Sequence, residues 1–257
     1  MKRGVVHFVG AGPGDPELLT VKGQRLIAEA DLVLYAGSLV PKEVVAGAKP
    51  SAKVADSAPM NLEETHAMMM ETVETGGSVA RVHTGDPSLY GAIREQAALL
   101  ERDGAAYDVT PGVTAGFSAA AAARRSYTVP ERTQTLIFTR LEGRTPVPEG
   151  ERLRDLAAHG SAMCGYLSAG DPEGVQSELE AGGLPPETLV VIAYRVGWPE
   201  EKVVEATVST LAHTARDNDF TRQTVFLVLP GQGPGDGESA KSLLYDKGFA
   251  HMYRKGE

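Results

Sequence analysis

Three short glycine-rich segments, each placed between an apolar-rich run and a stretch of helical spacing, constrain the fold of this chain more than any other feature. They read GAGPGD from position 10, TGDPSLYG from position 84 and TPGVTA from position 110. The runs before them resemble strands of a parallel sheet that is covered on both faces. Because the carboxyl ends of parallel strands share one edge of a sheet, the three segments predict a single ligand-binding rim.

Apolar runs alternate with helical stretches along nearly the whole chain. In the first half, the expected strands are 5–10, 31–36, 78–83 and 105–110, and the expected helices are 18–30, 62–74, 93–102 and 115–125. In the second half, the expected strands are 135–140, 162–167, 188–196, 203–208 and 224–229, and the expected helices are 151–159 and 173–181. Pro130 breaks any helix that would join the halves.

This order predicts an α/β fold with two α/β/α domains, mainly parallel sheets and a ligand cleft between the domains. We expect an N-terminal domain over 1–127, which carries the glycine-rich loops, and a C-terminal domain over 128–231. Residues 232–257 are expected to form a linker and a docked or flexible tail, because GQGPGDG precedes a segment with several large apolar side chains.

Charge and composition exclude several classes of function. The chain of 257 residues has 25 Lys and Arg against 34 Asp and Glu, a net charge of −9, which is unfavourable for nucleic-acid binding. Cys164 is the only cysteine, so no internal disulfide can form and a reducing compartment is favoured. No apolar run reaches the roughly 20 residues of a membrane span, and the N-terminus lacks a signal-like core. We therefore expect a cytoplasmic protein that binds neither nucleic acid nor membrane.

The first glycine segment invites comparison with the GxGxxG dinucleotide fingerprint. Gly10 and Gly12 fit that pattern, but Asp15 stands where its third glycine belongs. The expected second strand also lacks an acidic residue at its carboxyl end, where a ribose would be bound. Pro13 removes a backbone donor from the loop, which favours a ligand without phosphates. A nucleotide-dependent oxidoreductase remains an alternative at this point.

Each glycine segment can also be explained as a simple turn. Asp86 can cap a helix at Ser88, and Thr114 can cap the alanine-rich helix. Asp15 and Asp86 are weak candidates for a general base, since capping or ligand contact is the favoured explanation for each. Trp198, the only tryptophan, is expected to pack at a turn.

The segments GAGPGDPELLTVKG, ADLVLYAGSLV, TGDPSLYG and TPGVTA, in this order, resemble the tetrapyrrole (class III) methyltransferase family over roughly residues 5–229. The resemblance implies S-adenosylmethionine as methyl donor, a tetrapyrrole as small-molecule acceptor, and a homodimer. It implies donor contacts by Pro13, Thr84, Gly85, Asp86, Leu89, Thr114, Ala115, Tyr166, Leu167 and, at a backbone edge, Ala193. A non-catalytic binder of the donor or of a corrinoid is a further alternative.

Arginines are concentrated between positions 124 and 144. Five arginines and two glutamates lie there, a local excess of 5 − 2 = +3 in an acidic chain. Guanidinium groups match carboxylates in a bidentate geometry, and the implied acceptor carries many carboxylates. The residues expected to bind the acceptor are Arg124, Arg132, Arg140 and Arg144. The six histidines show no metal-ligand spacing with one another or with Cys164, so we expect no metal.

Overall fold

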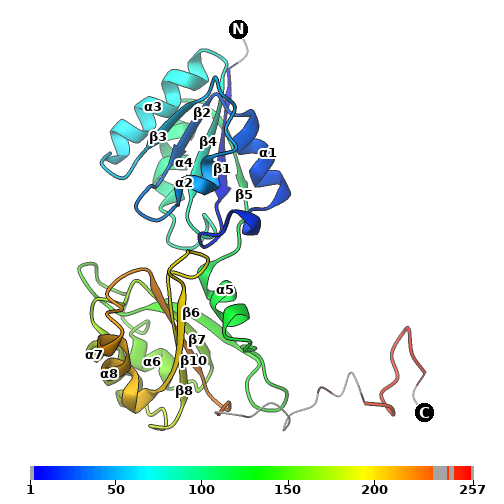
Figure 1. Ribbon diagram of the computed structural model, residues 1–257, viewed down its shortest axis with the longest axis vertical. Helices are drawn as coiled ribbons and strands as arrows, with labels where there is room; N and C mark the ends of the chain where they lie inside the picture. Colours follow the sequence, from blue (N-terminus) through cyan, green and yellow to red (C-terminus); the bar gives the residue numbers. More distant parts are fainter. Residues whose placement is uncertain (1–2, 234–241, 243–245, 256–257) are drawn as a thin grey trace. The chain divides into compact units, whose positions relative to one another are not determined.

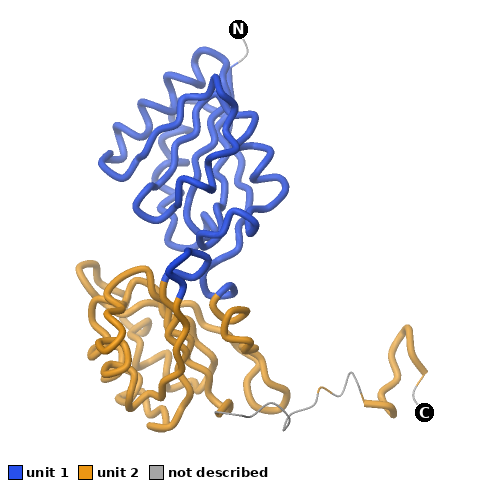
Figure 2. The backbone as a smooth tube through the Cα atoms, viewed as in Figure 1, with its two compact units in different colours: residues 1–118, 195–201 blue, residues 119–194, 202–257 orange. Residues whose placement is uncertain are grey.

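The computed structural model describes residues 3–233, 242 and 246–255. The chain divides into two compact units, which are coloured separately in Figure 2. The first comprises Met1–Ser118 and Arg195–Glu201, and the second comprises Ala119–Tyr194 and Lys202–Glu257. Each unit contains its own five-stranded sheet.

The sheet of the first unit is parallel throughout, with strand order β3-β2-β4-β1-β5. Its strands are β1 (Val5–Gly10), β2 (Leu32–Tyr35), β3 (Lys53–Asp56), β4 (Ser78–His83) and β5 (Ala106–Thr110). β1 lies between β4 and β5, and each of these three strands leads into one of the glycine-rich loops. The order of the strands therefore makes the three loops neighbours.

Helices cover both faces of this sheet, as Figure 1 shows. α1 (Val21–Glu29) and α2 (Lys42–Val45) pack on one face, in a cluster with Val9 and Val33. α3 (Leu62–Glu74) and α4 (Ile93–Arg102) pack on the other, in a cluster with Phe8 and Leu34. Neighbouring residues of one strand thus point into different cores, which explains why the strands are apolar throughout rather than alternating.

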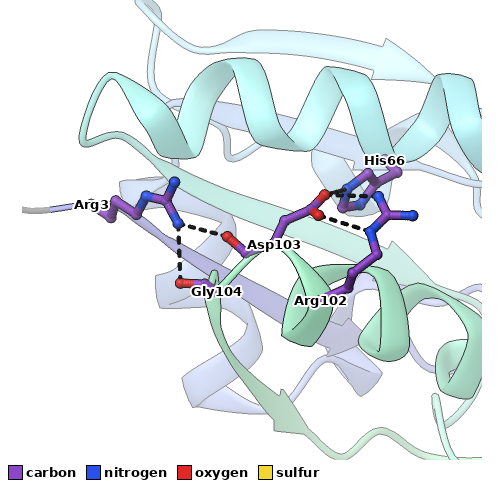
Figure 3. A network of polar contacts seen from close by, with 5 residues as sticks. All are labelled: Arg3, His66, Arg102, Asp103 and Gly104. Atoms are coloured by element: carbon purple, nitrogen blue, oxygen red, sulfur yellow. Dashed lines mark hydrogen bonds and ion pairs between the residues drawn. The ribbon is translucent and has the colours of Figure 1, made fainter.

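A polar network fixes the end of the sheet that lies opposite the glycine loops (Figure 3). Asp103 follows α4 and accepts from Arg102 Nε at 2.8 Å, while His66 Nε2 of α3 lies 2.7 Å from its other oxygen. Arg3 Nη1 donates to the carbonyls of Asp103 and Gly104. The hydrogen bonds from Arg102 and His66 hold the pKa of Asp103 well below its usual range. The network joins the start of the chain to the end of α4 and to His66 within α3.

The second sheet is mixed, with strand order β6-β7-β10-β8-β9. Its strands are β6 (Leu136–Arg140), β7 (Ala162–Tyr166), β8 (Leu189–Tyr194), β9 (Lys202–Thr207) and β10 (Thr224–Leu229). Only β6 and β7 pair in parallel among these strands, so the expected parallel arrangement describes the first sheet but not the second. A short connection joins β8 to β9, and connections of that length join antiparallel neighbours.

Three helices pack on one face of the second sheet. They are α6 (Leu153–Ala157), α7 (Pro172–Ala181) and α8 (Leu211–Asp217). Their buried side chains form one apolar cluster with Ile192 and Phe226 of the sheet. α5 (Ala115–Ala122) follows the third glycine loop, and the division between the units falls within it.

Several elements differ from the sequence prediction. The helix expected over 18–30 is a 3-10 turn, η1 (Pro16–Leu18), followed by α1, because Thr20 caps α1 by accepting from Gly23 N. β3 was not expected, since it is a short edge strand with largely exposed side chains. The domain boundary expected at 127 and 128 lies beyond α5 and stays a prediction.

The tail expected over 232–257 falls partly outside the described residues, which omit 234–241, 243–245 and 256–257. In the part that is described, His251 and Arg254 form an isolated bridge. Within the described residues, no helix is both long and apolar enough to cross a bilayer.

Candidate functional site

Backbone hydrogen bonds join the first and second glycine loops of the first unit. Ala11 N donates to His83 O at 2.7 Å. Gly12 and Gly85 then pair in both directions, with N···O distances of 3.2 and 2.7 Å. The carboxyl ends of β1 and β4 therefore continue as paired backbone beyond the sheet itself.

Glycine is required where these loops meet. A Cβ atom on Gly112 would lie 2.2 Å from Gly85 O, and one on Gly10 would lie 2.5 Å from Gly112 N. Real Cβ atoms do not approach backbone atoms so closely. Gly85 also has a φ of +61°, in the left-handed region that favours glycine. The rim is thus built from backbone, which leaves peptide groups rather than side chains to face a ligand.

Asp86 ties the second loop to the third. Its Oδ2 accepts from Gly112 N at 2.9 Å, and its Oδ1 accepts from the backbone and the hydroxyl of Ser88. Burial alone would raise the pKa of Asp86, but the hydrogen bonds from Ser88 and Gly112 lower it below its usual value. An ionised carboxylate held by three donors fits a bridging role better than that of a general base.

Asp15 closes the first loop. Its Oδ1 accepts from Glu17 N at 2.8 Å and caps η1, with Pro16 at the first position of the turn. Asp15, which stands where the dinucleotide fingerprint has its third glycine, therefore caps the turn that follows the loop. Its part as a general base remains untested.

The structure brings the predicted donor contacts of the first unit onto this one rim. Pro13 lies in the first loop, Thr84 and Leu89 in the second, and Thr114 just before α5. Ala115 is the first residue of α5, and Thr114 O accepts from Phe117 N and Ser118 N at its start. Their role in holding a donor stays a prediction.

The remaining predicted donor contacts belong to the second unit. Tyr166 ends β7, and Leu167 follows it with a φ of +55° and a side chain that is 70% exposed. Ala193 is fully buried in β8, which pairs with β10 on one side and β9 on the other. The expected backbone edge near Ala193 is therefore wrong as a description of the sheet, because β8 is an inner strand. Donor contact by Ala193 is untested.

Two of the four predicted acceptor arginines are engaged within the second unit. Arg140 donates to the carbonyls of Thr145 and Pro146 at 3.0 and 2.7 Å, and it thereby shapes its own loop. Arg132 Nη1 donates to Gly231 O. The guanidinium groups of Arg124 and Arg144 are exposed and make no hydrogen bond or ion pair with any described residue. Arg124 and Arg144 are therefore free to meet an anion.

His83 was not singled out from the sequence, yet it is buried at the end of β4, directly before the second loop. Its Nε2 atom has no hydrogen-bond partner among the described residues. Burial, and secondarily the charge of Arg81, lower the pKa of His83 to about 3. Arg81 itself is buried and bonded to Gln96 and Ser57. A neutral imidazole thus stands behind the rim at physiological pH.

Trp198 does pack at a turn, as expected, but the sequence did not reveal its partner. The segment Arg195–Glu201 connects two strands of the second unit and belongs to the first (Figure 2). Trp198 Nε1 donates to Pro13 O at 3.1 Å. The only sign of this contact in the sequence was a lone tryptophan between Gly197 and Pro199.

The described residues give little support to a cysteine nucleophile or to a bound metal ion. Burial raises the pKa of the Cys164 thiol to about 12, so it is no ready nucleophile. Among the residues that the structure describes, no group of three or more His, Cys, Asp or Glu side chains could hold a metal ion. Independence from metal stays a prediction.

The family profile described as Tetrapyrrole (Corrin/Porphyrin) Methylases matches residues 5–212. The chain belongs to this family. Among curated relatives, the cobalt-precorrin-4 C(11)-methyltransferase of Priestia megaterium is 46% identical to this methylase over 252 residues, which are 98% of each chain.

Solved structures agree with this placement of the methylase. A cobalt precorrin-4 methyltransferase is 47% identical, with a TM-score of 0.85 over 87% of this chain and 94% of that one. A uroporphyrin-III C-methyltransferase from Thermus thermophilus, complexed with S-adenosylhomocysteine, is 28% identical, with a TM-score of 0.71 over 88% of this chain and 97% of that one. The resemblance drawn from the glycine segments is confirmed, and so is the α/β fold.

Substitution of Gly112 tests the backbone construction of the rim. We expect Gly112→Ala to lower the free energy of unfolding by about 1–3 kcal/mol, because the new methyl overlaps Gly85 O and forces the loops apart. Gly47→Ala is the matched control, since nothing lies within 4 Å of the added methyl group. Urea unfolding measures both variants. Equal stability of the two would contradict the close approach.

Burial of neutral His83 predicts an acid sensitivity. In the unfolded chain a histidine has a pKa of about 6.5, whereas His83 has a folded pKa of about 3. Between these values only the unfolded chain binds the proton, so the free energy of unfolding falls as the pH drops, by up to about 1.4 kcal/mol per pH unit. We expect His83→Gln to have a shallower slope than the wild type between pH 6 and 4, and exposed His159→Gln to keep the wild-type slope. Urea unfolding at several pH values measures the slopes; a wild-type slope in His83→Gln would refute the assignment.

Proposed function

We propose that this methylase transfers a methyl group from S-adenosylmethionine to ring carbon C-11 of precorrin-4, in its metal-free or cobalt-loaded form, and so gives the corresponding precorrin-5 in cobalamin biosynthesis. The observation that carries the proposal is likeness over essentially the whole chain to a protein named for this reaction. The structural likeness to a cobalt precorrin-4 methyltransferase supports it independently of any one motif. Because both names include cobalt, the cobalt-loaded acceptor is the form favoured here.

The rim of the first unit suits the proposed donor. S-adenosylmethionine has no phosphate, so it does not need the cradle of N–H groups that a dinucleotide needs, and Pro13 in the loop is no obstacle. Ionised Asp86 adds a negative charge near the backbone-lined rim, which favours the positive sulfonium and ammonium groups of the donor. The proposed donor contacts are those that the resemblance implied: Pro13, Thr84, Gly85, Asp86, Leu89, Thr114, Ala115, Tyr166, Leu167 and Ala193.

The proposed reaction makes modest demands on side chains. The bond between sulfur and the methyl carbon breaks as a nucleophilic ring carbon forms a new bond to that methyl, and S-adenosylhomocysteine leaves with the electron pair on sulfur. The sulfonium already makes the methyl electrophilic, so no covalent enzyme intermediate is needed. The task of the protein is to align the two reactants and exclude water. A site built from glycine, proline and threonine backbone fits that task.

We base the proposed location, oligomeric state and metal requirement of the enzyme on the same resemblance. We expect a cytoplasmic homodimer that needs no metal ion of its own; cobalt, where present, belongs to the acceptor. The described part of the chain has no helix able to cross a membrane.

Labelled methyl transfer tests the proposed function. The protein is incubated with methyl-labelled S-adenosylmethionine and with either precorrin-4 or cobalt-precorrin-4, and the label is then located on the ring by NMR. We expect label at C-11, with the higher kcat/KM for the cobalt form. Label at another carbon would assign a different ring methylation, and donor binding without any transfer would favour a non-catalytic binder. Binding of NAD in place of the donor would favour the oxidoreductase.

Arginine substitutions test how the acceptor is recognised. Arg124→Ala and Arg144→Ala are each expected to raise the KM for the acceptor by about tenfold, since a lost charged hydrogen bond of roughly 1.5 kcal/mol corresponds to that factor. Arg140→Ala is expected to perturb its loop as well, because its guanidinium donates to carbonyls there. Arg25→Ala on α1, which removes an exposed i,i+4 ion pair, serves as control. Unchanged KM in both Arg124→Ala and Arg144→Ala would remove them from the acceptor site.

A further inference from the structure

Trp198 packs against the first glycine loop. Two glycines, one in each segment, leave the space that this contact needs. A Cβ atom on Gly14 would lie 2.4 Å from Trp198 Cδ1, and one on Gly197 would lie 2.8 Å from Asp15 N. The two segments therefore interlock at distances that only glycine permits on each side. The indole N–H completes the contact by donating to Pro13 O at 3.1 Å.

The peptide that Trp198 holds is the part of the loop with the fewest other restraints. Toward the N-terminus, Gly12 is fixed by its paired hydrogen bonds with Gly85. Toward the C-terminus, Asp15 is fixed as the cap of η1. Pro13 and Gly14 span the interval, and Gly14 contributes no side chain that could anchor it. A hydrogen bond to Pro13 O therefore sets the orientation of this peptide.

Trp198 is itself held in place by its own segment. The Arg195 guanidinium lies 4.3 Å from the centre of the indole ring and pairs with Glu200 at 3.1 Å. Gly197 N donates to Glu201 Oε2 at 2.8 Å, and Gly197 has a φ of +79°. The indole is thus supported by a cation on its face and by a turn that is closed by a carboxylate. Such a side chain can impose its position on a loop that has little rigidity of its own.

We propose that Trp198 is a positioning residue for the methyl donor: its indole N–H fixes the Pro13 carbonyl and so presets the first glycine loop for S-adenosylmethionine. This inference rests on the proposed role of Pro13 in donor binding. Trp198 acts through Pro13 and touches no reacting atom, so its loss weakens donor binding while the transfer step at saturating donor proceeds at nearly the normal rate.

Trp198→Phe is the decisive variant, because it keeps an aromatic ring and removes the N–H. Tyr107→Phe is the matched control: it also removes one side-chain donor, Tyr107 OH to Glu101 at 2.6 Å, from the first unit, near the end of the sheet opposite the glycine loops. We expect the Kd for S-adenosylhomocysteine, measured by calorimetry, to rise about three- to tenfold in Trp198→Phe and less than twofold in Tyr107→Phe. The KM for the donor should rise in parallel, with kcat changed less than twofold.

Fluorescence gives a readout that requires no variant. Trp198 is the only tryptophan, so tryptophan emission of the wild-type protein reports on this contact alone. We expect saturable change of that emission on addition of S-adenosylhomocysteine, with the Kd found by calorimetry.

The outcomes separate this inference from the proposed function. Wild-type affinity in Trp198→Phe, together with unchanged emission when the wild-type protein binds S-adenosylhomocysteine, would overturn the role of Trp198 and leave the donor site standing. A fall in kcat as large as the rise in KM would also overturn it, because the residue would then act on the transfer step. Absence of any calorimetric binding to the wild-type protein would refute the donor site itself, and the role of Trp198 with it.

Discussion

The close approach of three backbone segments at Gly10, Gly85 and Gly112 is the constraint on which the rest of the first unit depends. Contacts of 2.2–2.5 Å to an added Cβ leave no room for any other residue at Gly10 or Gly112. The parallel sheet brings β4 and β5 to either side of β1, and the loops meet only because that order places them together. Asp86, bonded across to Gly112, then holds the arrangement with a side chain that stays ionised.

Much of this arrangement could be predicted from the sequence, because it is local. An apolar run, a glycine turn and a capped helix are each encoded within about fifteen residues, so the three loops and most strands of the first unit were found. The mixed pairing of the second sheet was not, since a strand such as β10 reads the same whether its neighbours are parallel or antiparallel. β3 was missed for another reason: an exposed edge strand lacks the apolar pattern on which the prediction relied.

The site residues show the same division between local and distant information. Asp15 and Asp86 could be recognised as capping residues because their partners, Glu17 and Ser88, lie two positions away. Trp198 meets Pro13 across 185 positions, and no pattern within either segment announces the other. His83 could be seen as the end of a strand, but not as an imidazole kept neutral by burial beside Arg81. Contacts that are created by the fold have to be read from the fold.

The membership of Arg195–Glu201 in the first unit bears on how this protein can be divided. The chain leaves the first unit after Ser118, returns to it at Arg195 and leaves again after Glu201. No single cut therefore yields both units complete, and a fragment that ends at Ser118 would lack the indole that holds Pro13. A transfer of the complete first unit into a related methylase would therefore have to include the seven residues Arg195–Glu201 as well as the first 118.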